Sequence, residues 1–176
     1  MATPPVILSI AGSDPSGGAG IQADLKTCAT LGVYGAAAIT CLTVQNTTGV
    51  RSFTLLAPEL VREQIRAVLD DLPVSHVKIG MVGSAAIATV IAEALADFHG
   101  EVVYDPVLRA GAGQSLLEGE ARAALSQLLA RATALTPNLP ELVALSGSPC
   151  ATAQEITVAV VALFQAHPRL AAVVVT

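Results

Sequence analysis

The sequence has 176 residues, the length of one ordinary domain. Hydrophobic residues make up 53% of it and charged residues 13%, a balance that excludes intrinsic disorder. The net charge is −5, no basic stripe is present and aromatic residues make up 3%, so we expect a small-molecule partner and no nucleic acid.

Apolar runs of strand length alternate with segments of helical spacing along the chain. Strands are predicted at 6–10, 36–44, 50–56, 77–80, 101–104, 132–135 and 171–175. Helices are predicted at 21–31, 58–72, 84–98, 118–129 and 156–164, with another after Asn138. Asn138 with Glu141, and Thr152 with Glu155, have the spacing of capping boxes.

This alternation predicts an α/β fold with a mostly parallel central sheet and helices on both faces. No linker or internal repeat interrupts the pattern, so we expect residues 1–176 to belong to a single domain. The last segment, 171–176, is an apolar strand with no helix after it. Because an exposed apolar edge favours aggregation, we expect the natural sheet to continue and the fold to lack its C-terminal portion here.

The three cysteines, Cys28, Cys41 and Cys150, follow no zinc or disulfide spacing, and we interpret them as free thiols. Free thiols are typical of a reducing compartment and no signal-peptide pattern opens the sequence, so we expect a cytoplasmic protein. The uncharged stretch 27–50 contains glycines, threonines, Gln45 and Asn46, which favour strand and turn over a membrane span. No membrane partner is therefore expected.

A glycine-rich segment, AGSDPSGGAG at 11–20, joins the first strand to the first helix. Glycines let a backbone approach a ligand closely, and the helix start beyond them offers free N–H groups. A tight strand-to-helix turn is the plainer interpretation, but four glycines exceed what a turn needs. The segment matches neither the P-loop pattern nor the dinucleotide fingerprint G-x-G-x-x-G.

The segment AGSDPSGGAGIQADLKT at 11–27 resembles the opening of hydroxymethylpyrimidine/phosphomethylpyrimidine kinases of thiamine biosynthesis. Four further stretches resemble this family in the same order: TVQNT at 43–47, KIGM at 78–81, DPV at 105–107 and TPNLPE at 136–141. The family has a ribokinase-like fold, which the resemblance therefore implies for this chain. Pyridoxal kinases share parts of these motifs.

The resemblance implies that the glycine-rich loop faces the pyrimidine substrate and that ATP lies mainly against the C-terminal half. Gln45 would then hydrogen-bond the pyrimidine's amino group and ring nitrogen, since a carboxamide offers a donor beside an acceptor. The other substrate-binding residues implied are Gly12, Ala19, Asp24, Met81 and Val107. Alternatives stay open: Gln45 can cap a strand end, and Met81 can be core filler. Thr43 stands where the family has a small apolar residue.

For the cofactors ATP and Mg²⁺, the resemblance implies Asp105, Asn138 and Glu141 near the phosphates. Asp105 and Glu141 would hold the metal directly or through water, because Mg²⁺ prefers oxygen ligands. The capping role of Asn138 and Glu141 is an equally good interpretation. Arg109 would lie in a phosphate-side loop or simply on the surface.

The resemblance implies an enzyme that phosphorylates 4-amino-5-hydroxymethyl-2-methylpyrimidine and then its monophosphate. The resemblance also allows this enzyme to be a homodimer. The family completes its site with a Gly-Gly-His stretch and a Gly-Thr-Gly-Cys loop, and neither occurs in these 176 residues. We therefore assign no catalytic residue here and expect no turnover from this chain alone. Pyridoxal kinase activity and a non-catalytic pyrimidine-binding module are the alternatives, whereas a dinucleotide-dependent oxidoreductase would rest on fold analogy alone.

Overall fold

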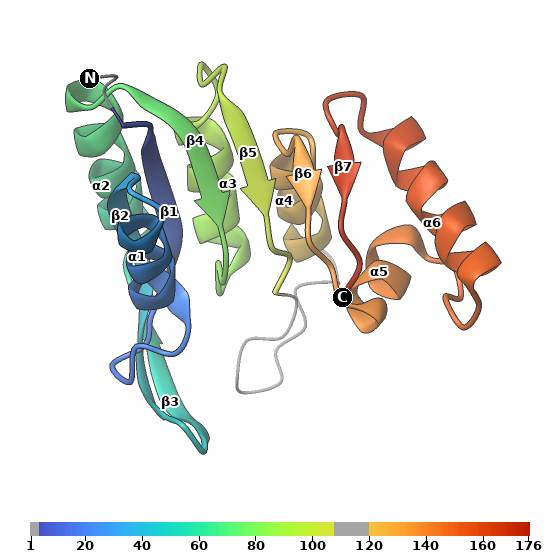
Figure 1. Ribbon diagram of the computed structural model, residues 1–176, viewed down its shortest axis with the longest axis horizontal. Helices are drawn as coiled ribbons and strands as arrows, with labels where there is room; N and C mark the ends of the chain where they lie inside the picture. The colour runs from blue at the N-terminus through green and yellow to red at the C-terminus, as the bar shows by residue number, and fades with distance from the viewer. Residues whose placement is uncertain (1–3, 108–119) are drawn as a thin grey trace.

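The computed structural model describes residues 4–107 and 120–176, and its described strands form one seven-stranded sheet (Figure 1). The strand order is β3-β2-β1-β4-β5-β6-β7, and every neighbouring pair is parallel except β2 with β3. The strands are β1 Val6–Ser13, β2 Tyr34–Asn46, β3 Gly49–Leu55, β4 Val74–Ile79, β5 Glu101–Tyr104, β6 Ala134–Leu135 and β7 Ala172–Val173. The helices are α1 Gly20–Thr30, α2 Pro58–Asp71, α3 Ala85–Ala94, α4 Glu120–Leu129, α5 Leu139–Ser146 and α6 Ala153–Ala166.

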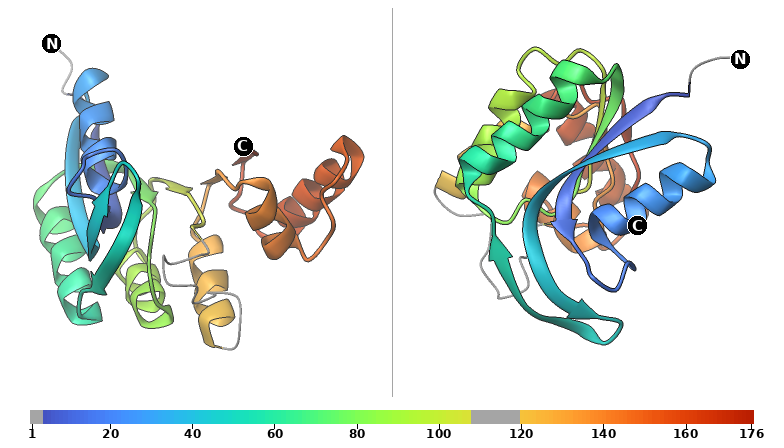
Figure 2. Two further views of the ribbon diagram at one scale, coloured as in Figure 1. Left: turned by 90° about the horizontal axis from the view of Figure 1, so that it is seen from below. Right: turned by 90° about the vertical axis from the view of Figure 1, so that its left-hand side faces the viewer.

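Helices cover both faces of this sheet, which confirms the predicted α/β architecture (Figure 2). On one face α2, α3 and α4 lie side by side, α3 in contact with both of the others. On the opposite face α1 packs across β1 and β2. The pair α5 and α6 lies beside β7 at the end of the sheet (Figure 1).

The core lies mainly between the sheet and the layer of α2, α3 and α4. Leu8 and Ile10 of β1, Ile79 of β4, Ile65 of α2 and Ile91 of α3 are all fully buried. Each such side chain stabilises the fold by about 1.5–3 kcal/mol relative to an exposed position. The periodic apolar residues that predicted these elements are thus the residues that hold them together.

Side-chain caps explain where several helices begin. The side chains of Ser84, Asn138 and Thr152 each accept a hydrogen bond from a backbone N–H in the first turn of their helix. Glu141 and Glu155 complete the two predicted capping boxes. No helix within the described residues is long and apolar enough to cross a membrane.

Some boundaries differ from the sequence-based prediction. Helix α3 ends at Ala94 instead of Phe98, because the N–H groups of Ala96 and Phe98 bond to carbonyls three residues back, in tighter turns. Strand β1 continues past Ile10 to Ser13, since β2 pairs with it over that length. The last two strands are shorter than predicted, because only two residues of each join the ladder.

The topology determines where a ligand can bind. The chain moves from β1 outward to β2 and β3, and then returns to the other side of β1 with β4. This change of direction is a topological switch point, where open parallel sheets bind ligands beyond the carboxyl ends of their strands. The carboxyl ends of β1, β4 and β5 meet at this edge, and the glycine-rich loop leads from β1 into α1 there.

Candidate substrate-binding site

A cavity of about 210 Å³ lies at this switch point. Six residues that the sequence analysis named line it together: Gly12, Ala19, Gln45, Met81, Asp105 and Val107. They come from the end of β1, the β1–α1 loop, β2 and the segments that follow β4 and β5. The fold therefore brings together residues more than 90 positions apart in the sequence.

The remaining predicted site residues lie outside the cavity lining. Asp24 of α1 is bonded to Ser9 and Lys78 instead. Asn138 and Glu141 form the capping box of α5 at the carboxyl end of β6. Arg109 falls in the segment 108–119, outside the described residues.

The glycine-rich loop is organised around the carboxylate of Asp14, a residue that is only 2% exposed. This carboxylate accepts hydrogen bonds from the backbone N–H groups of Ser16 (2.8 Å), Gly18 (3.1 Å) and Ala19 (2.9 Å). Burial alone would raise the pKa of Asp14, but these bonds and those from the Ser16 hydroxyl lower it below its ordinary value. The loop's amide donors are thus already engaged by an anion of the protein itself.

The start of α1 is joined tightly to the end of β1. The Gln22 side chain accepts from the Asp14 N–H (2.8 Å) and donates to the Ser13 hydroxyl (2.7 Å). Gly20 has a φ of +58°, and a Cβ placed there would lie 2.2 Å from the carbonyl oxygen of Gly12. Only glycine fits at position 20, because both its backbone conformation and this contact exclude a side chain.

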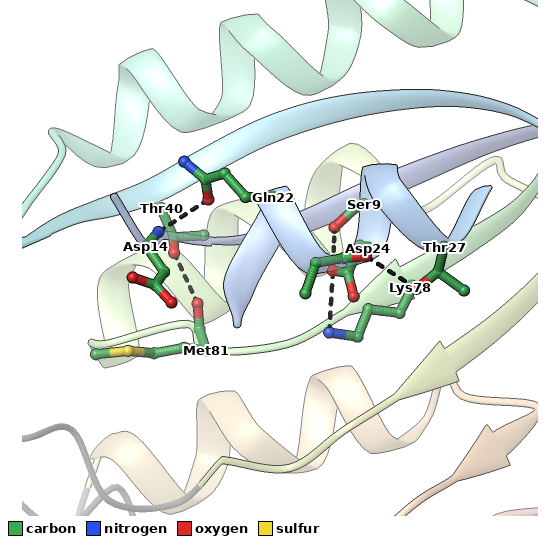
Figure 3. Close-up of polar contacts among 9 residues, drawn as sticks. Ser9, Asp14, Gln22, Asp24, Thr27, Thr40, Lys78 and Met81 are labelled. Carbon is green, nitrogen blue, oxygen red and sulfur yellow. Dashed lines mark hydrogen bonds and ion pairs between the residues drawn. The ribbon is translucent and has the colours of Figure 1, made fainter. Parts of the chain in front are cut away.

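An apolar wall closes one side of the cavity. The Met81 carbonyl accepts from the Thr40 hydroxyl (2.6 Å), as Figure 3 shows. The Met81 sulfur lies 3.9 Å from the Cys41 sulfur. Burial raises the pKa of the Cys41 thiol, so it stays neutral. A Cβ at Gly12 would lie 2.7 Å from the Cys41 sulfur, which explains the glycine next to this wall.

Polar groups from β2 face the same cavity. The Gln45 carboxamide makes no hydrogen bond to another described residue, so both its donor and its acceptor are available to a ligand. The Thr43 hydroxyl donates to the Ser13 carbonyl (2.9 Å). The threonine that departs from the family pattern therefore ties β2 to the end of β1.

Sequence reasoning missed a charged network beneath the cavity. Asp24 of α1 accepts from the Ser9 hydroxyl (2.6 Å) and from the Lys78 ammonium (3.1 Å), and Lys78 also lines the cavity (Figure 3). Burial raises the pKa of Asp105. The positive charge of Lys78 lowers this pKa, and the negative charge of Asp24 raises it further. The available signal was a lysine within the short strand predicted at 77–80, since lysines are almost never fully buried unless they are paired.

A family comparison agrees with the geometry. A sequence model of the family described as phosphomethylpyrimidine kinase matches residues 14–176. The chain belongs to the phosphomethylpyrimidine kinase family. The hydroxymethylpyrimidine/phosphomethylpyrimidine kinase of Rhizobium meliloti (strain 1021) is 50% identical over 143 residues, which are 81% of this chain and 54% of that relative. The chain thus spans about half the length of this curated relative.

Solved structures show the same fold. The phosphomethylpyrimidine kinase of Clostridium difficile 630 superposes with a TM-score of 0.83 at 40% identity, over 93% of this chain and 71% of that one. A Bacillus subtilis pyridoxal kinase, solved as an ADP complex, gives 0.82 at 32% identity, over 99% of this chain and 65% of that one. The ribokinase-like fold and the family resemblance inferred from the motifs are confirmed.

Asp105 directly follows β5, and Glu141 lies in the first turn of α5, after β6. Burial raises the pKa of Tyr104 well above its usual range, and the carboxylates of Asp105 and Glu141 add to the effect. Both carboxylates therefore act on the same buried phenol, which lies at the end of β5. Within the described residues, no group of three or more His, Cys, Asp or Glu side chains forms a metal cluster.

Proposed function

We propose that this chain provides the pyrimidine-binding part of an ATP-dependent kinase of thiamine biosynthesis. Its substrates would be 4-amino-5-hydroxymethyl-2-methylpyrimidine, here called the alcohol, and the monophosphate of that alcohol. The observation that carries the proposal is the Asp14 carboxylate, which occupies the amide donors of the loop. A loop whose N–H groups are already bonded to an anion does not suit a nucleotide phosphate.

The size and chemistry of the cavity favour a single flat ring. Its volume of about 210 Å³ is smaller than the roughly 300 Å³ at which sites for drug-sized ligands begin. Met81 and Val107 give apolar contact, and the Gln45 carboxamide offers a donor and an acceptor side by side. An aminopyrimidine presents the complementary pair of a ring nitrogen and an amino group.

Asp105, Asn138 and Glu141 remain our candidates for the ATP and Mg²⁺ side, with Asp105 and Glu141 nearest the metal. Asp105 fits because its carboxylate opens into the cavity and Mg²⁺ takes oxygen ligands. Glu141 also bonds the backbone N–H of Asn138 (2.9 Å), so one residue would serve as cap and as metal neighbour. The ion would supply charge neutralisation for phosphoryl transfer, with nucleotide phosphates and water completing its ligand set.

Pyridoxal kinase activity is the second candidate. It is favoured by the high structural similarity to the Bacillus subtilis pyridoxal kinase. Pyridoxal is also a small substituted heteroaromatic ring, but it lacks the amino group beside a ring nitrogen that would pair with Gln45. A non-catalytic pyrimidine-binding module is the third candidate, and it predicts the same ligand preference without turnover.

Titration calorimetry separates the two pyrimidine-binding candidates from pyridoxal kinase activity. The 176-residue chain is titrated with the alcohol, with pyridoxal and with Mg-ATP, and then with the alcohol in the presence of Mg-ATP. The proposal predicts that the alcohol binds at least about tenfold more tightly than pyridoxal, because an unpaired Gln45 amide is costly. Competition between Mg-ATP and the alcohol for the same site, or tighter binding of pyridoxal, would contradict it.

The cellular setting is part of the proposal as well. The three cysteines are all buried and free of disulfides, which supports a reducing cytoplasm. The homodimer that the resemblance allows remains a prediction, to be checked by sedimentation.

A further inference from the structure

Lys78 has an unusual position in the cavity. It is the only basic residue among the described residues of the lining, where Asp14 and Asp105 supply negative charge. A ligand carrying a phosphate group would meet two carboxylates there, and the Lys78 ammonium is the one favourable charge in the lining. The cavity therefore contains a cation that a neutral heterocycle does not require.

The Lys78 ammonium is bonded to Asp24 but keeps N–H donors available for a ligand. Its hydrogen bond to Asp24 is 3.1 Å long, and the two side chains are 27% and 23% exposed. A lysine has three N–H donors, and this bond to Asp24 is the one that Lys78 makes among the described residues. Asp24 keeps the Ser9 hydroxyl at 2.6 Å as a second partner, so its carboxylate stays bonded if Lys78 moves.

Gly80 lets the ammonium reach the cavity. A Cβ at Gly80 would lie 2.8 Å from the Lys78 Nζ and 3.1 Å from the Cβ of Ala11. Lys78, Gly80 and Ala11 all line the cavity, so the ammonium lies beside the part of the wall that Gly80 and Ala11 form. A methyl group at position 80 would push the flexible lysine tip away and leave its charge intact.

We infer that Lys78 binds the phosphate group of the pyrimidine monophosphate, and that Asp24 is the countercharge of the ammonium that this phosphate replaces. The inference rests on the proposed function and names the residue that distinguishes the second substrate from the first. A charged donor to a phosphate oxygen forms a short, charge-assisted hydrogen bond. A purely structural role explains less, because partly exposed ion pairs contribute little to stability.

The first test compares two ligands in titration calorimetry, the alcohol and its monophosphate. We expect Lys78→Met to weaken binding of the monophosphate by about tenfold or more and binding of the alcohol by less than about twofold. Arg66→Met is the matched control, because it removes one positive charge from the exposed side of α2. It should change neither affinity by more than about twofold.

Two further variants separate phosphate binding from a structural ion pair. Asp24→Asn releases the ammonium from its countercharge, so binding of the monophosphate should become about two- to fivefold tighter. A structural pair predicts the opposite, since losing either partner would then weaken binding of both ligands. Gly80→Ala displaces the ammonium without removing it, and it should weaken binding of the monophosphate selectively.

The outcomes are distinguishable. Equal losses for both ligands in Lys78→Met, or weaker monophosphate binding in Asp24→Asn, would overturn the inference and leave the proposed function standing. A wild-type chain that fails to bind the alcohol would overturn both. Circular dichroism verifies folding, and if Lys78→Met is unfolded, Lys78→Arg decides, because it must retain preference for the monophosphate while Gly80→Ala loses it.

Discussion

The Asp14 carboxylate accepts the backbone N–H of Ala19 at 2.9 Å, and Ala19 is the N-cap residue of α1. A helix N-terminus is an ordinary place for a phosphate, because its first N–H groups lack partners within the helix. Here an aspartate from the same loop lies where that phosphate would bind. The loop is thereby made rigid and negatively charged, which suits the wall of a pocket for a neutral ring.

Replacing Asp14 tests this organisation. Asp14→Asn should lower the urea midpoint at pH 7 and weaken alcohol binding by about threefold or more, because a preorganised loop is lost. The folded pKa of Asp14 lies below its ordinary value of 3.8, so the ionised form stabilises the fold above about pH 4. That contribution disappears as the pH falls through the folded pKa.

The pH dependence of stability is an internal control for the Asp14→Asn prediction. The difference in stability between wild type and Asp14→Asn should therefore shrink below about pH 4. Asp70→Asn, on the exposed surface of α2, should have the stability of the wild type both at pH 7 and below about pH 4. A difference for Asp14→Asn that stays constant down to pH 3 would argue against the carboxylate as the organiser of the loop.

The ligand-binding role of Gln45 can be tested with a variant on the neighbouring strand β3 as the control. Gln45→Ala should weaken alcohol binding by about tenfold, since two hydrogen bonds to the ring are lost, and should leave the thermal midpoint nearly unchanged. Ser52→Ala on β3 removes an exposed polar group from the same hairpin and should have no effect on affinity. Unchanged affinity in Gln45→Ala would leave Gln45 as a strand-end residue only.

Gly20 should be far less tolerant of alanine than Gly32. Both have positive φ, +58° and +69°, but a Cβ at Gly20 meets the Gly12 carbonyl, whereas nothing lies within 4 Å of one at Gly32. Gly32→Ala should cost about 1–2 kcal/mol for the left-handed conformation alone. Gly20→Ala should cost at least about 2 kcal/mol more, or prevent folding, because backbone atoms would clash. Urea unfolding measures both, and equal costs would contradict the tight junction of β1 and α1.

The ionised Asp105 carboxylate is predicted to lower the stability of the fold, while it serves the binding of ligands in the cavity. Burial raises its pKa above 3.8, so stability decreases as the pH rises from about 4 through the folded pKa, and the full cost is present at neutral pH. Asp105→Asn should therefore be more stable than the wild type at pH 7, with no gain at pH 3. Thermal unfolding at the two pH values checks this, and a destabilised variant at pH 7 would show that the carboxylate has a structural role.

Much of the fold could be predicted because its signals are local. Pro58 at the start of α2 and the two capping boxes define helix starts through bonds within a few residues. The apolar runs of β1 and β5 indicated buried parallel strands, since both faces of such strands are covered. Local signals failed at the boundary of α3, where three-residue turns replace the last helical turn.

The candidate site was only partly predictable, because its geometry depends on distant contacts. Motif resemblance indicated Gln45, Met81 and Asp105, which do line the cavity. It did not indicate that Lys78 would face the cavity and Asp24 would lie behind it, since this arrangement depends on how α1 packs against β4 across β1.

The amino-acid sequence by itself determined the order of strands and helices, the two capped helix starts and the need for glycine in the β1–α1 loop. Those features follow from backbone conformation and from periodic burial, which act over a few residues. Only the tertiary structure decided that the loop's donors bind the Asp14 carboxylate, and that Lys78 and Gly80 lie together in the wall of the cavity. Such pairings depend on atoms that approach within a few ångströms after the sheet has assembled, and no local pattern encodes them.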